Sequence, residues 1–114
     1  MTDVTPLIKS NQMVIQSYGP QGFKISGVVY NHPVLVLPDQ VFHWDGETFT
    51  DLLKIKDQID VTLLGTGKTA KHPAKDKKPQ GLHLEVSDTG AACRAYNALM
   101  ADGRRVAAAL KLPL

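Results

Sequence analysis

Cysteine, aromatic residues and long apolar runs are all scarce in this chain of 114 residues. The single Cys93 cannot form a disulfide within the chain, so nothing in the sequence points to an oxidising compartment. No apolar run is long enough to span a bilayer, and residues 1–6 lack the pattern of a secretory or mitochondrial leader. We therefore expect a cytoplasmic protein that does not insert into a membrane.

Positive and negative residues are nearly balanced in number. Thirteen lysine and arginine residues face eleven aspartate and glutamate residues, which gives a net charge of +2 and no indication of a polyanionic partner. One stretch is nevertheless rich in lysine: Lys68, Lys71, Lys75, Lys77 and Lys78. Because no aromatic residues are interleaved there, we interpret it as a solvated loop and do not expect nucleic-acid binding.

The sequence lacks the usual motifs of metal, cofactor and nucleophile chemistry. Its four histidines do not have the spacing of a zinc site: His32, His43, His72 and His83. Residues 65–69 resemble the end of a phosphate-binding P-loop, but that motif requires a glycine where Thr62 stands. Cys93 has no neighbouring base. We predict no metal, no cofactor and no catalytic residue, which favours a binding protein over an enzyme.

The residues that are present fit one α/β domain over residues 1–114, with 43% hydrophobic and 21% charged residues. Residues 13–31 predict a β-hairpin that turns at Gly19-Pro20-Gln21, with a bulge at Gly27. Three apolar runs predict buried strands, at residues 33–38, 59–64 and 82–86.

Helices are predicted between and after these strands. Thr48 and Asp51 have the spacing of a capping box at the start of a short helix. Residues 90–110 have a helical pattern that Asp102-Gly103 divides, which leaves Arg104 to Leu110 as a second, alanine-rich helix. The alternation of strands and helices predicts a three-layer α/β domain with a mixed, mainly parallel central sheet, an N-terminal hairpin and C-terminal helices.

Two strand-to-helix loops form the strongest site candidate. Residues 64–68 follow one predicted strand and residues 88–94 follow the next. Ligands of open parallel sheets bind beyond the carboxyl ends of the strands, and a helix start with small residues such as Gly90 attracts anions. With Lys68 and Arg94 nearby, the loops could bind, or turn over, a small anionic metabolite or nucleotide.

Alternatives to a ligand site remain open for these residues. Glycine and alanine are also what a tightly packed strand-to-helix turn requires, and Arg94 could pair with Asp88 instead of a ligand. We expect the aromatic residues Phe42 and Trp44 to pack in the core or at its rim, and Trp44, if exposed, would suit a protein partner as an anchor.

Several motifs, in the same order, resemble the Mth938-like domain of unknown function over roughly residues 5–112. They are Tyr18-Gly19-x-x-Gly22-Phe23-x-Ile25-x-Gly27, Val34 to Pro38 with Trp44, Leu64 to Gly67, Thr89 to Arg94 with Tyr96 and Asn97, and Gly103 to Leu110. That family includes small bacterial and archaeal proteins, an adipogenesis-associated human protein and a mitochondrial assembly factor for respiratory complex I.

The resemblance implies a three-layer fold and, by analogy, a non-enzymatic interaction protein that assists the assembly of a membrane or respiratory complex through an unknown protein partner. Together with the loops it defines the candidate binding residues: Gly65, Thr66, Gly67, Lys68, Thr89, Gly90, Arg94 and Asn97. Ala95 departs from the family, which commonly has threonine there. We do not carry over the mitochondrial location, because we see no leader.

Overall fold

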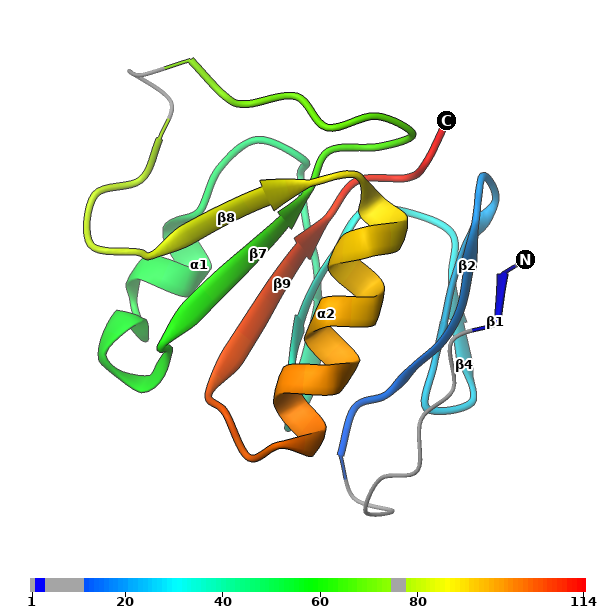
Figure 1. Ribbon diagram of the computed structural model, residues 1–114, viewed down its shortest axis with the longest axis horizontal. Coiled ribbons are helices and arrows are strands. Elements are labelled where there is room, and N and C mark those ends of the chain that lie inside the picture. The colour runs from blue at the N-terminus through cyan, green and yellow to red at the C-terminus, as the bar shows by residue number, and fades with distance from the viewer. Residues whose placement is uncertain (1, 4–11, 75–77) are drawn as a thin grey trace.

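The computed structural model describes residues 2–3, 12–74 and 78–114, which form two β-sheets and their helices (Figure 1). The first sheet has four antiparallel strands in chain order: β1 (Thr2–Asp3), β2 (Ile15–Gly19), β3 (Gly22–Ile25) and β4 (Val28–Tyr30). The second has five strands in the order β6-β5-β9-β7-β8: β5 (Val34–Leu37), β6 (Gln40–His43), β7 (Val61–Gly65), β8 (Leu84–Ser87) and β9 (Val106–Leu110).

Strands β7, β8 and β9 run parallel to one another, whereas β5 and β6 are antiparallel additions, so the sheet is mixed as predicted. Helix α2 (Thr89–Ala101) lies on one face of this sheet and packs there together with β2 and β3. The short helix α1 (Thr50–Leu53), followed by the 3-10 turn η1 (Lys56–Gln58), covers the other face. The prediction of a three-layer α/β domain is confirmed.

The predicted hairpin is present, but Gly27 lies in a turn between two strands and not within one strand. Ser26 and Gly27 both have positive φ, 45° and 87°, and they turn the chain tightly between β3 and β4. The predicted second strand is therefore two strands, and Gly27 is not a bulge. The irregularity in the ladder lies instead between Ile15 and Ser17 of β2.

The prediction of a helix over Arg104 to Leu110 is wrong. Val106–Leu110 is the central strand β9, which pairs antiparallel with β5 and parallel with β7. Alanine favours helices locally, but pairing on both edges and burial on both faces outweigh that preference here. Three consecutive alanines at 107–109 also keep the middle of the sheet thin, so helices can pack closely on either face.

The capping box at Thr48 is also not formed. The carboxylate of Asp45 accepts hydrogen bonds from the backbone N–H groups of Glu47 and Thr48 and from the Thr48 hydroxyl, at 2.8–2.9 Å. These bonds hold the pKa of Asp45 below its usual value. Helix α1 begins at Thr50 and has no side-chain cap, because its N-cap residue is Phe49, whose side chain cannot accept a hydrogen bond.

The carboxyl ends of β7, β8 and β9 meet at one edge of the five-stranded sheet (Figure 1). Three segments therefore begin at this edge: the loop after Gly65 follows β7, the start of α2 follows β8, and the segment from Lys111 follows β9. Among the described residues, no helix is long and apolar enough to cross a membrane.

Candidate functional site

The two predicted loops lie against each other, joined by hydrogen bonds. The N–H of Thr66 donates to the carbonyl oxygen of Ser87 at 3.0 Å, and the N–H of Thr89 donates to that of Gly67 at 2.8 Å. The Gly67 N–H donates in return to the Thr89 hydroxyl at 2.9 Å. The sequence correctly placed these loops together, and the structure joins them without a gap for a ligand between Gly67 and Thr89.

The end of β9 completes this junction. The fully buried hydroxyl of Thr89 donates to the carbonyl oxygen of Lys111 at 2.7 Å, and the Lys111 N–H donates to that of Gly65 at 2.9 Å. A Cβ on Gly65 would lie 2.9 Å from the Cα of Thr89. Glycine at this position is therefore explained by the close approach of two backbones.

The start of α2 is already occupied. The carboxylate of Asp88 accepts a hydrogen bond from the Ala91 N–H at 2.9 Å, as a helix cap does. Gly90 faces the ring of Tyr18, where a Cβ would lie 2.6 Å from the phenol oxygen. Arg94 donates to that oxygen at 2.9 Å, so it binds Tyr18 of the four-stranded sheet.

Asn97 joins α2 to β2. Its side-chain oxygen accepts from the Ile15 N–H at 3.0 Å, and its side-chain nitrogen donates to the Ile15 carbonyl oxygen at 2.8 Å. The side chain is only 3% exposed. Like a neighbouring strand, the Asn97 side chain satisfies both backbone hydrogen-bonding groups of Ile15. These contacts place Asn97 in the interior of the protein.

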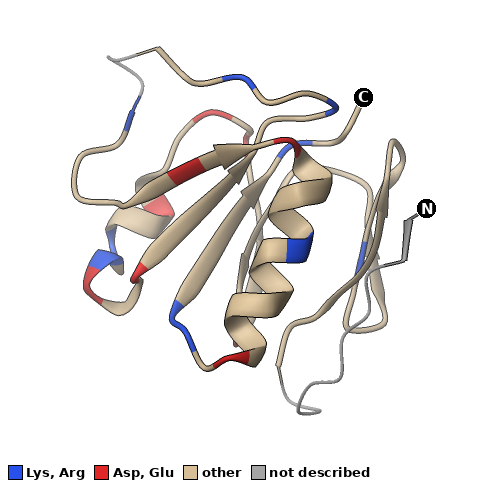
Figure 2. Ribbon diagram, viewed as in Figure 1, with Lys and Arg blue, Asp and Glu red and all other residues tan. Residues whose placement is uncertain are grey.

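Open space lies on the other side of the loop that follows β7. A hollow of about 420 Å³ there is lined by Lys68, Lys71 and Lys111, with Thr66, Asp45 and Glu47 among its other walls. We call it the lysine pocket. Figure 2 shows basic segments in the loop after β7 and at the end of β9. None of the ion pairs formed among the described residues includes one of these three lysines.

A second hollow adjoins it. The apolar pocket, of about 310 Å³, has Trp44, Phe49, Leu64 and Pro73 in its walls and shares Glu47 and Lys111 with the lysine pocket. The Trp44 and Phe49 rings are tilted with centroids 5.7 Å apart, and the indole N–H donates to the Thr48 carbonyl oxygen at 2.6 Å. Trp44 is only 2% exposed, so it is a wall of this pocket and not the exposed anchor considered above.

Lys111 is the pocket residue that sequence reasoning missed. Taking residues 104–110 as a helix hid the fact that Lys111 ends a central parallel strand, at the edge where the loops gather. The apolar run from Val106 to Leu110, followed by a lysine, was the available signal. The predicted lysine loop is exposed at Lys68, Lys71 and Lys78, whereas Lys75 and Lys77 lie outside the described residues.

Cys93 lies inside the core, where burial raises the pKa of its thiol from 9.0 to about 12. We expect a thiol reagent at about pH 8 to label the native chain far more slowly than the urea-unfolded chain, because only the thiolate reacts. Since the folded pKa is the higher one, this thiol supports folding fully below pH 9.0 and progressively less as the pH rises to about 12. Native labelling as fast as unfolded labelling would contradict this.

Histidines contribute a contact between the two sheets. The rings of His32 and His43 stack with centroids 4.0 Å apart, and Tyr30 meets His32 edge-on at 6.0 Å. In the part of the chain that the structure describes, no three His, Cys, Asp or Glu residues are grouped closely enough to hold a metal ion.

Comparison with known proteins gives the family. A model described as "Protein of unknown function (DUF498/DUF598)" matches residues 15–111. A zebrafish (Danio rerio) protein named NADH dehydrogenase [ubiquinone] 1 alpha subcomplex assembly factor 3 is 36% identical over 112 residues, which cover 88% of this chain but only 64% of that protein. An uncharacterised protein of Rhodobacter capsulatus is 36% identical over 107 residues, 88% of this chain and 84% of its own length.

Solved structures share the fold. The solution structure of a Bordetella pertussis protein, described as a Mth938-like domain, matches with a TM-score of 0.74 and 23% identity, over 99% of this chain and 93% of that one. The two loops, the start of α2 and the whole of β9 fall inside the family match. This chain therefore belongs to the DUF498/DUF598 family and has the fold of the Mth938-like domains.

Proposed function

We propose that this chain binds a protein partner and assists the assembly of a membrane-bound NADH dehydrogenase complex. The observation that carries the proposal is the zebrafish relative, whose name is that of an assembly factor and whose likeness extends over 88% of this chain. Because this chain spans less than two thirds of that relative, the proposal concerns the shared domain, which includes both loops and the three lysines of the lysine pocket.

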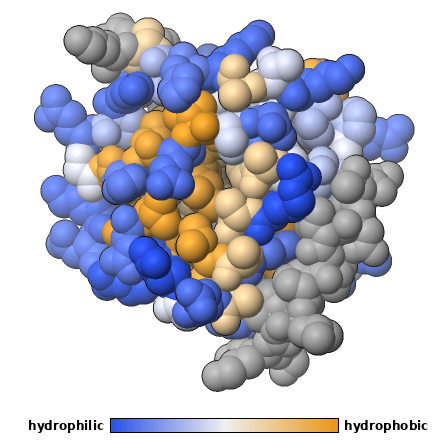
Figure 3. Space-filling view, in the orientation of Figure 1, coloured by the Kyte–Doolittle hydropathy of each residue, from blue (hydrophilic) through white to orange (hydrophobic). Residues whose placement is uncertain are grey.

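The surface supports protein binding. Val28 and Val29 of β4 are 53% and 63% exposed, and β4 pairs only with β3 among the described strands. Exposed β-branched residues on an edge strand are typical of surfaces that another chain covers. Hydrophobic residues also gather over β7 and β8 beside α2, with hydrophilic residues around them (Figure 3).

The side chains of the loop site are engaged within the protein, which argues against catalysis by them. Thr89, Arg94 and Asn97 were candidates for ligand contact, and each is hydrogen-bonded within the protein. The thiol of Cys93, the one nucleophile candidate, is held protonated by burial. The hypothesis of a small anion or nucleotide stays a prediction, and such a ligand would have to use Lys68 in the lysine pocket, because the start of α2 is capped and covered.

The test is loss of assembly. In cells lacking this chain, we expect less fully assembled NADH dehydrogenase on native gels and lower NADH oxidation by isolated membranes. Affinity capture of the tagged chain after crosslinking should return subunits of that complex. Restoring the chain is the control. Full assembly without the chain, together with capture of the chain alone, would overturn the proposal.

A further inference from the structure

The apolar pocket and the lysine pocket lie side by side and share Gly46, Glu47 and Lys111 as walls, and we refer to the two together as the groove. The groove lies at the carboxyl ends of β7 and β9, where open sheets hold their ligands. Trp44, Phe49 and Leu64 place it on the same face of the sheet as α1, away from the start of α2, and its two halves differ in chemistry.

The apolar half suits a bulky apolar or aromatic side chain. Its walls include Trp44, Phe49 and Leu64, and apolar walls favour an apolar guest because contact removes both surfaces from water. Sites of this kind are mostly apolar, with a few polar groups that fix the orientation of the ligand. Here Lys111 and Glu47 are the polar groups at its rim.

The lysine half suits carboxylates. Lys68, Lys71 and Lys111 form none of the ion pairs found among the described residues, so their ammonium groups are available to an incoming anion. Three lysine side chains face two carboxylate side chains in this half, and that of Asp45 already accepts three hydrogen bonds from its own turn. The excess of positive charge therefore complements an acidic ligand.

We propose that this groove binds a peptide segment of a partner protein in which a bulky apolar residue stands next to acidic residues. The inference rests on the proposed function and deepens it by naming the partner's chemistry. The apolar side chain enters beside Trp44, and the neighbouring carboxylates meet Lys68, Lys71 and Lys111. A peptide fits better than a single anionic head group because the rim carries both signs, and Glu47 can accept a backbone N–H of the bound chain.

Trp44 provides the measurement, because it is the only tryptophan in the chain. Short peptides with one Phe or Leu among Asp and Glu residues are titrated while its fluorescence is followed. Two matched sets replace the apolar residue by Ala or the acidic residues by Lys, and dodecanoate and inorganic phosphate are titrated separately. We expect saturable changes that are stronger for the acidic apolar peptides and that weaken with salt. Binding of dodecanoate or phosphate without binding of these peptides, or no binding at all, overturns the proposal.

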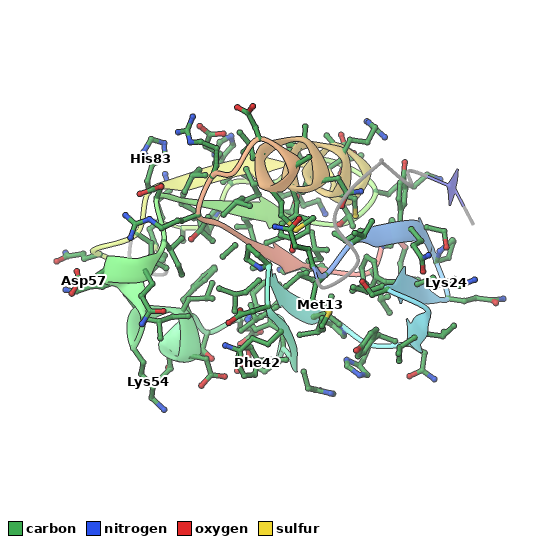
Figure 4. The ribbon with its side chains drawn as sticks, turned by 90° about the horizontal axis from the view of Figure 1, so that it is seen from below. Met13, Lys24, Phe42, Lys54, Asp57 and His83 are labelled. Carbon is green, nitrogen blue, oxygen red and sulfur yellow. The ribbon has the colours of Figure 1, made fainter. Side chains whose placement is uncertain are left out.

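Charge-reversal variants locate the contact. Lys68→Glu and Lys111→Glu should each weaken peptide binding by about tenfold. Lys24→Glu is the matched control, because Lys24 is exposed on β3, lines neither pocket of the groove and projects outward from the molecule (Figure 4). It should change binding by less than about twofold. Equal loss in all three variants would mean general charge attraction and would overturn the assigned groove.

Partner capture separates the two proposals. If the Lys68→Glu and Lys111→Glu chains capture the same partners as the natural chain, the groove is not the partner site, although the interaction function stands. If the acidic peptides bind in the groove but cells without the chain assemble the complex fully, the proposed function fails and the groove's preference stands.

Discussion

Replacing Thr89 by valine is expected to lower the free energy of unfolding by about 3 kcal/mol. Valine has nearly the same shape, so the loss comes from hydrogen bonds. The buried hydroxyl accepts from the Gly67 N–H and donates to the Lys111 carbonyl oxygen, and both groups would be left without a partner. Urea unfolding followed by circular dichroism gives the measurement.

Thr62 offers a matched control for this substitution. It is also fully buried, in β7, but its hydroxyl has no hydrogen-bond partner among the described residues. Thr62→Val should therefore leave stability unchanged or raise it by up to about 1 kcal/mol, because an unsatisfied polar group is removed. If both valine variants lose the same stability, volume and not hydrogen bonding explains the loss at Thr89.

Replacing Asn97 by alanine is expected to cost about 3 kcal/mol as well, and to loosen one sheet more than the other. The substitution leaves the N–H and the carbonyl of Ile15 without the side chain that now satisfies both. Since Ile15 begins β2, amide hydrogen exchange should rise in β2 and β3 before it rises in β7 and β9.

Ala98→Ser is a suitable comparison, because residue 98 is on the same helix but exposed. It should change stability by less than about 0.5 kcal/mol. A uniform increase of exchange over both sheets in Asn97→Ala would contradict the assigned role, since it would mean that the whole domain opens as one unit.

Local patterns predicted most of the fold, but not the position of its central strand. The run Val34 to Leu37 is apolar at every residue and rich in β-branched valine, which is typical of a strand covered on both faces. Val106 to Leu110 is equally buried, yet three alanines give it the local preference of a helix. The interactions that decide its conformation are with β5 and β7, which lie far away in the sequence.

For the candidate site, the sequence placed the loops correctly because parallel strands end at the same edge. It could not show that Asp88 and Tyr18 cover the start of α2, since the contact of Tyr18 with Gly90 and Arg94 depends on how the two sheets pack. It also missed Lys111, whose position follows from β9 being a strand.

The central place of β9 has a consequence for synthesis of the chain. Strands β5 and β7 leave the ribosome before β9, yet β9 is the strand that lies between them. At about 5–20 residues per second, the nascent chain presents two apolar strand edges for seconds before the strand that joins them exists. During that interval the half-made sheet is open to the wrong partners, so the last-made part of the domain decides whether the earlier parts fold or aggregate.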